Sequence, residues 1–164
     1  MVLGRIISGK FGEICVRQKS DADIELGELL VAEDGTKKSL FQVYDLVYGS
    51  QVSQQNLELI SGMSLEGEED VQFFDPNLRN YKLAYLKNLI TLSNTSSRTS
   101  KTLPNFFSEV RGVKEEDLSF LVTPKDGMFI GNLRSGSKKL DVGISIPGKE
   151  VLSHHVLIPA STGK

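Results

Sequence analysis

The chain has 164 residues and a mass of 18.1 kDa, with 39% hydrophobic and 24% charged residues. This composition is typical of a globular protein and suffices for one domain with a hydrophobic core, or one small domain and part of another. The single cysteine, Cys15, excludes an intramolecular disulfide and favours a reducing compartment. The sequence shows neither a signal peptide nor an apolar run of the roughly 18 residues that a membrane span needs. We therefore expect a cytoplasmic chain with no membrane segment.

The formal net charge of −2 excludes a chain that is strongly basic throughout, but the charge is unevenly distributed. Residues 1–75 carry 6 Lys/Arg and 14 Asp/Glu, whereas residues 76–164 carry 13 and 7. The two parts thus have net charges of −8 and +6. Two solvated surfaces would explain this gradient, and so would a mildly basic second half that faces a nucleotide or nucleic acid. Charge counting leaves both interpretations open.

The first half of the chain predicts short strands separated by turns. Ile14 and Val16 alternate with polar neighbours, which is the period of a half-buried strand, and Asp34-Gly35 is a strong turn signal. The same pattern predicts strands over residues 3–8, 11–17, 26–33, 40–48 and 81–92. Five such strands with frequent turns indicate a mainly β chain that forms a small closed antiparallel β-barrel, because closure removes exposed strand edges.

Two segments interrupt the predicted strands between residues 50 and 80. Good helix formers over residues 51–61, ending at Gly62, predict a short helix. The acidic run Glu66–Asp70 follows, but it lacks the spaced ligands and the turn of a calcium loop. We interpret this run as a solvated loop and expect no metal site.

The polar run Ser93–Thr102 marks the clearest change of composition and predicts a linker or mobile loop, because it has no side chains with which to build a core. Short helical turns are predicted over residues 105–109, after Pro104, and over residues 114–118. Strand character returns over residues 120–122, 128–133, 140–146 and 156–158.

The last residues of the sequence suggest the beginning of a phosphate-binding loop. An apolar strand over residues 156–158 leads into small residues, which let successive backbone N–H groups approach phosphate oxygens. Ala160 would take the first small position of that loop, and Ser161, Thr162, Gly163 and Lys164 the next four. The Gly-Lys-Ser/Thr that would complete the pattern after these residues is not in the sequence. An ordinary strand followed by a loop of small residues, with no phosphate-binding role, would show the same pattern.

Two further clusters contain residue types that carry chemistry. His154 and His155 are adjacent, and adjacent strand residues point to opposite faces, so we interpret them as structural residues. Arg134, Ser135, Ser137 and Lys138 form a basic segment with small hydroxyl residues, which predicts either an anion or interface contact or a plain basic turn. No catalytic residues stand out.

Several stretches, taken in order, resemble the N-terminal part of archaeal HerA-type ATPases of the HerA/FtsK translocase group. They are Gly4–Glu13, Val43–Gln51, Leu78–Ala84, Ile130–Lys138 and His154–Lys164, and together they cover nearly the whole chain. The resemblance implies a HAS-type barrel over residues 1–92, a polar linker with short helices over 93–125, and the truncated start of a RecA-like α/β ATPase core over 126–164. It also implies that Ala160–Lys164 begin the Walker A loop.

The resemblance further implies what the parent protein does. Proteins of this family form hexameric rings around duplex DNA, use ATP and magnesium, and work with a NurA-like nuclease in DNA end processing and repair. The N-terminal barrel would then serve ring assembly and docking of the nuclease. Magnesium and ATP belong to the parent protein, and we expect neither to act on the chain alone.

Two other functions remain open from the sequence. A stand-alone β-barrel that binds nucleic acid would need a basic groove with aromatic residues on the barrel itself, which the net charge of −8 and the absence of tryptophan disfavour. An unrelated nucleotide-binding enzyme of the P-loop superfamily would differ only in sequence that follows Lys164.

The incomplete Walker A pattern gives a first prediction. The 164-residue chain should not hydrolyse ATP, because the Gly-Lys-Ser that holds the phosphates and magnesium, and the Walker B carboxylate, are missing from it. Release of inorganic phosphate should equal that of a buffer blank. Turnover above the blank would contradict this interpretation.

Overall fold

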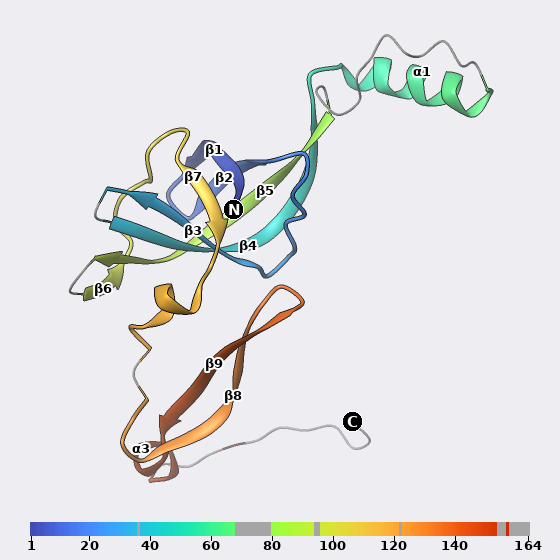
Figure 1. Cartoon of the computed structure of the whole chain (residues 1–164). Coiled ribbons are helices and arrows are strands. Elements are labelled where there is room, and N and C mark those ends of the chain that lie inside the picture. Colours follow the sequence, from blue (N-terminus) through green and yellow to red (C-terminus); the bar gives the residue numbers. More distant parts are fainter. Residues whose placement is uncertain (36, 68–79, 94–95, 122, 154–156, 158–164) are drawn as a thin grey trace, which may run out of the picture. The chain divides into compact units, whose positions relative to one another are not determined.

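The chain forms two compact units, Met1–Val113 and Lys114–Lys164, in a computed structural model (Figure 1). The structure describes all residues except 36, 68–79, 94–95, 122, 154–156 and 158–164. Among the described residues, no helix has the length and apolar character that crossing a lipid bilayer requires.

Strands of the first unit close into a small antiparallel barrel. The strands of this unit are β1 (Val2–Lys10), β2 (Glu13–Gln18), β3 (Leu29–Asp34), β4 (Lys37–Ser50), β5 (Asn80–Ser93), β6 (Ser96–Thr99) and β7 (Glu109–Gly112). The ring runs β1–β7–β3–β4–β5–β2 and closes because β2 pairs with both β1 and β5. β6 pairs with β5 outside the ring. The predicted mainly β fold with a small closed antiparallel barrel is therefore confirmed.

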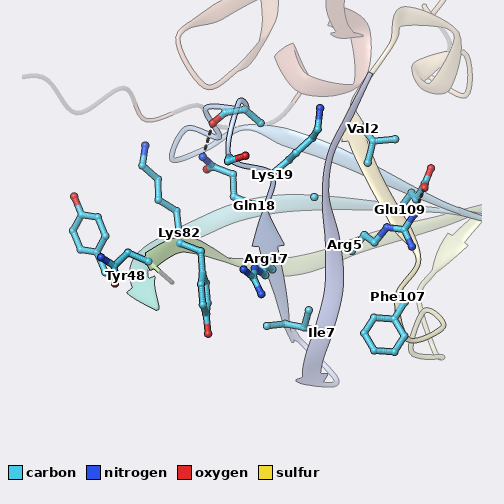
Figure 2. Close-up of a pocket in the computed structure, with 15 residues that line it drawn as sticks. Val2, Arg5, Ile7, Arg17, Gln18, Lys19, Tyr48, Lys82, Phe107 and Glu109 are labelled. Atoms are coloured by element: carbon cyan, nitrogen blue, oxygen red, sulfur yellow. Dashed lines mark hydrogen bonds and ion pairs between the residues drawn. The ribbon is translucent and has the colours of Figure 1, made fainter. Parts of the chain in front are cut away.

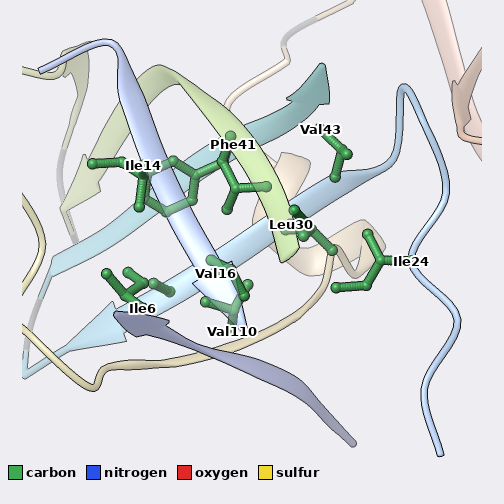
Figure 3. Packing of buried hydrophobic residues seen from close by; sticks show 11 residues of the cluster. Ile6, Ile14, Val16, Ile24, Leu30, Phe41, Val43 and Val110 are labelled. Atoms are coloured by element: carbon green, nitrogen blue, oxygen red, sulfur yellow. The ribbon is translucent and has the colours of Figure 1, made fainter. Parts of the chain in front are cut away.

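The barrel interior is filled by apolar side chains at every second position of facing strands (Figure 3). This spacing is what a half-buried strand requires, since alternate residues point inward. The core residues are Ile6, Ile14, Val16, Ile24, Leu30, Ala32, Phe41, Val43, Ala84, Leu86 and Val110. Phe41 is the largest of the fully buried side chains. The alternation of Ile14 and Val16 in the sequence is thus confirmed.

A bulge changes which residues of β4 face the core. Regular alternation would place Phe41, Val43 and Val47 on one face of β4, but the register of β4 against β5 shifts between Val43 and Asp45. One extra residue moves the following side chains to the opposite face. Leu46 therefore packs against the core, and Val47 is only half-buried.

Strands β4 and β5 continue past the core as a two-stranded ribbon that carries the helix α1 (Gln54–Leu65), as Figure 1 shows. The Oγ of Ser53 accepts a hydrogen bond from the backbone N–H of Asn56 at 3.4 Å and caps the helix. The helix predicted over residues 51–61 is therefore confirmed, with its start and end displaced by three to four residues toward the C-terminus.

The second unit contains a short 3₁₀ helix, a hairpin and one more short helix. Its elements are η2 (Glu115–Leu118), β8 (Gly127–Ser135), β9 (Lys138–Pro147) and α3 (Gly148–Leu152). The helical turn predicted near residues 114–118 is confirmed. β8 and β9 pair antiparallel in a separate sheet. The RecA-like core assigned to residues 126–164 stays a prediction.

The barrel extends further along the sequence than the predicted boundary at residue 92. β7 lies between β1 and β3, so the ring cannot close without it. The first compact unit accordingly ends at Val113. A four-residue strand with one fully buried residue, Val110, has too little periodicity to be recognised in the sequence.

The polar run Ser93–Thr102 is not simply a linker, because it contains β6. Residues 96–99 pair with the end of β5, and the described side chains Ser97, Arg98 and Thr99 are exposed. An edge strand outside the barrel has backbone partners on one side but no core to face, so serine and threonine suffice there. Composition alone therefore suggested a loop where backbone pairing makes a strand.

Two other local predictions differ from the structure. Residues 105–109 form a turn followed by β7 instead of a helix, with Phe107 at a φ of 62°. The strand predicted over residues 120–122 is absent at Phe120 and Leu121, which lie at and just after a turn, and residue 122 lies outside the described residues. β1 and β2 are joined by the turn Phe11-Gly12, because Lys10 still pairs with Glu13.

The core gives a second prediction. Phe41→Ala should lower the free energy of unfolding by about 3–5 kcal/mol, because it removes a fully buried ring from the barrel centre and leaves a cavity. Phe11→Ala is the matched control: its ring is 59% exposed, and the change should stay within about 0.5 kcal/mol. Urea unfolding of both variants measures the difference, and equal losses would contradict the assigned core.

Candidate functional site

The predicted phosphate loop cannot be placed in three dimensions. Ala160, Ser161, Thr162, Gly163 and Lys164 lie outside the described residues, as do His154 and His155. The partial Walker A assignment therefore stays a prediction.

The predicted basic segment lies at the tip of the β8–β9 hairpin. Ser135 pairs with Lys138 across a two-residue turn in which Gly136 has a φ of 59°. The Nη2 of Arg134 donates to the backbone carbonyl of Ser137 at 3.4 Å. Arg134 also lies opposite Lys139 in the register. The structure thus brings the four predicted residues together, in the basic turn that the sequence gave as one of two interpretations.

A second candidate site, which the sequence analysis did not predict, is a groove of about 970 Å³ on the first unit (Figure 2). Its walls come from β1, β2 and the loop after it, the ribbon ends of β4 and β5, and the turn into β7. The charged and aromatic residues that line it are Arg5, Arg17, Lys19, Tyr48, Tyr81, Lys82, Phe107 and Glu109. The lining has four cations, and three of them form ion pairs with carboxylates: Arg5 with Glu109, Lys19 with Asp21 and Lys82 with Asp23.

Two arginines lie side by side in this groove. Arg5 on β1 is the direct cross-strand partner of Arg17 on β2, and like charges in that position destabilise a sheet. On the other side of β1, the Nη2 of Arg5 lies 2.6 Å from the Oε1 of Glu109. Both side chains of this ion pair are more than half exposed, so solvent screens it. Arg5 and Arg17 thus place two positively charged side chains on adjacent strands of the groove.

Tyr81 supports Arg17 from the neighbouring strand. The guanidinium carbon of Arg17 lies 4.0 Å from the centre of the Tyr81 ring, a cation–π contact. Gly49 makes room for this ring, because a Cβ on Gly49 would lie 2.3 Å from the Cε2 of Tyr81. The absence of a side chain at Gly49 thus allows the Tyr81 ring to lie against β4, where it contacts Arg17.

Phe107 stands at the other end of the groove in a strained conformation. Its φ of 62° is unusual for a bulky residue and costs of order 1–3 kcal/mol. Two backbone hydrogen bonds hold the turn: Phe107 N–H donates to the carbonyl of Ile6 at 2.9 Å, and Ile6 N–H donates to that of Ser108 at 3.1 Å. The ring is 61% exposed and packs edge-to-face against Phe106, with 5.1 Å between the two ring centres.

The loop after β2 carries Lys19 and, through Asp23, also holds Lys82 of β5 at the rim of the groove. Buried Gln18 holds this loop, since its amide donates to the carbonyl of Ala22 and its Oε1 accepts from the backbone of Ile24. Lys19 Nζ lies 2.7 Å from an oxygen of Asp21, and this hydrogen bond lowers the pKa of Asp21. Lys82 Nζ lies 2.9 Å from Oδ1 of Asp23, whose hydrogen bond raises the pKa of Lys82.

The residue types of the groove suit binding better than catalysis. Its lining contains neither histidine nor cysteine, and the described part of the chain holds no group of three metal-ligating side chains. Exposed guanidinium and ammonium groups beside aromatic rings bind anions that also have a flat or apolar part.

Comparison of the chain with protein-family models gives no match, and neither does comparison with curated proteins. Its functional interpretation therefore rests on the residues and their geometry.

The groove was missed because its residues come from separate segments whose overall charge is negative. The cations alternate with core residues: Arg5 precedes Ile6, and Arg17 follows Val16. That alternation places both arginines on the outer face of their strands. The signal that could have revealed the groove is the register of β1 against β2, which makes Arg5 and Arg17 neighbours.

The Gly49–Tyr81 contact gives a third prediction. Gly49→Ala should displace the Tyr81 ring and separate it from Arg17, while changing the free energy of unfolding by about 1 kcal/mol, as expected for a half-buried cation–π pair. The NMR signal of the Arg17 side-chain N–H should lose its ring-current shift. Gly131→Ala, at a glycine with nothing within 4 Å, should leave that signal in place.

Proposed function

We propose that this chain is the N-terminal assembly and partner-docking domain of a HerA-like, hexameric, ATP-dependent DNA translocase. The barrel would be a HAS-type barrel, and the second unit would lead into a RecA-like ATPase core. In the parent protein it would act in the cytoplasm with a NurA-like nuclease in DNA end processing and repair.

The exposed helix on the β4–β5 ribbon is the observation that carries the docking role. None of the residues of α1 is buried, while Leu59 and Leu65 are 63% and 83% exposed. A 12-residue helix is marginal in water unless an apolar face packs against something. A second copy of the chain or a nuclease subunit would supply that packing surface.

Two further features support the proposal. Closure of the barrel leaves its backbone groups paired around the ring, so the barrel is a rigid base for a projecting arm. In the parent, Ala160–Lys164 would open the Walker A loop that binds ATP and Mg²⁺. The basic hairpin with Arg134, Ser135, Ser137 and Lys138 would contact an anion or a neighbouring subunit just before that loop.

The proposal gives a fourth prediction. Replacing Leu59 and Leu65 by Asp should weaken binding of the chain to a NurA-like nuclease, or to itself, by roughly tenfold or more, because it places charge in the proposed interface. Sedimentation velocity measures both associations. Leu103→Asp is the control, since Leu103 is 52% exposed and lies outside α1.

Circular dichroism should show that the barrel of the double variant is intact. If the wild-type chain neither self-associates nor binds the nuclease, or if the double variant binds as tightly as the wild type, the docking role is contradicted.

A further inference from the structure

We propose that the groove on the barrel binds single-stranded nucleic acid, with phosphates held at Arg5 and Arg17 and a base stacked on Phe107. This inference goes beyond the docking role and does not depend on it, because the groove residues are distinct from those of α1. It also supplies the basic, aromatic-lined groove that nucleic-acid binding by this barrel requires.

The two arginines provide the reason for a polyanion. They are cross-strand partners, so the fold places two guanidinium-bearing side chains on neighbouring strands of one groove. A phosphate at this place would accept charge-assisted hydrogen bonds from guanidinium groups. Figure 2 shows Arg17 and Ile7 on one side of β1 and Phe107 on the other, with Arg5 and Glu109, and all of these residues line the same groove.

The aromatic residues favour a nucleic acid over an acidic peptide. Phe107 is exposed and held by two backbone hydrogen bonds in a conformation that phenylalanine rarely adopts. Such strain is typical of functional positions. A base has a flat face that stacks on an exposed ring, whereas the side chains of an acidic peptide do not.

The same aromatic residues favour a single strand over a duplex. Paired bases stack on one another, so a duplex covers the faces that Phe107 and the 90%-exposed Tyr48 would contact. Tyr48 lies opposite Lys82 in the ribbon, which places a second cation and aromatic pair at the far end of the groove. A strand that follows the groove would therefore meet alternating charge and ring surfaces.

Carboxylates at the groove are competitors that a nucleic acid must displace. Three solvent-exposed ion pairs lie at the groove: Glu109 with Arg5, Asp21 with Lys19, and Asp23 with Lys82. Exposed pairs of this kind add little to stability, so phosphate groups can replace them. Removing one of these carboxylates should strengthen binding, which a purely structural role for the groove would not predict.

The test uses the full 164-residue chain and a fluorescein-labelled thymidine oligonucleotide of roughly ten residues. Fluorescence anisotropy over a range of salt concentrations measures affinity. Arg17→Ala should weaken binding roughly tenfold and reduce the salt dependence by about one phosphate contact. Phe107→Ala should also weaken binding roughly tenfold, but with the salt dependence unchanged. Glu109→Gln should strengthen binding.

Matched controls separate the groove from general charge and exposure. Arg98→Ala removes one exposed arginine from β6, and Phe11→Ala removes one exposed ring from the β1–β2 turn. Neither should change the affinity. Urea unfolding should show that Arg17→Ala remains folded, so that its loss of affinity reflects lost contacts with the oligonucleotide and not an unfolded chain.

Several outcomes would overturn the proposal. These are no measurable binding at low salt, equal losses in Arg98→Ala and Arg17→Ala, or binding of a duplex as tight as that of the single strand. Competition by polyglutamate of equal charge, with no effect of Phe107→Ala, would instead assign the groove to an acidic peptide. Because the measurement involves neither the nuclease nor self-association, its failure would leave the docking role of α1 to its own test.

Discussion

Pairing of β2 with β5 is the interaction on which the rest of the first unit depends. Residues 14–17 of β2 pair with residues 83–86 of β5, although nearly 70 residues separate them in the chain. This pairing converts an open sheet into a ring and encloses the apolar side chains of six strands. It also places Arg17 beside Tyr81 at the end of that ladder. Barrel closure and groove assembly thus have a common origin.

The groove shows that net charge is a poor guide to local charge in a small barrel. Residues 1–75 are acidic overall, yet strand alternation and pairing gather Arg5, Arg17 and Lys19 on one surface. Several of the acidic residues lie beside these cations in exposed ion pairs, where they adjust the charge of the groove without cancelling it. An anionic ligand can therefore displace these carboxylates and bind the cations of the groove.

The proposed roles use different parts of one rigid scaffold. The ribbon of β4 and β5 carries α1 away from the core and suits docking, whereas the groove lies where the ribbon leaves the barrel. A domain of this design could dock a nuclease and hold a single strand near it. Gly49 matters to this design because its missing side chain lets Tyr81 lie against β4, at the point where the ribbon and the groove meet.

The sequence by itself determined the main elements of this protein. Period-two alternation such as that of Ile14 and Val16, turn residues such as Gly35, and a run of good helix formers are local signals, and they predicted the strands, α1 and the closed barrel. Only the tertiary structure decided that β7 completes the ring, that the polar run after β5 forms β6, and that Arg5, Arg17 and Phe107 share one groove. The physical reason is that short strands and surface sites are defined by partners distant in the chain, whose register no local pattern encodes.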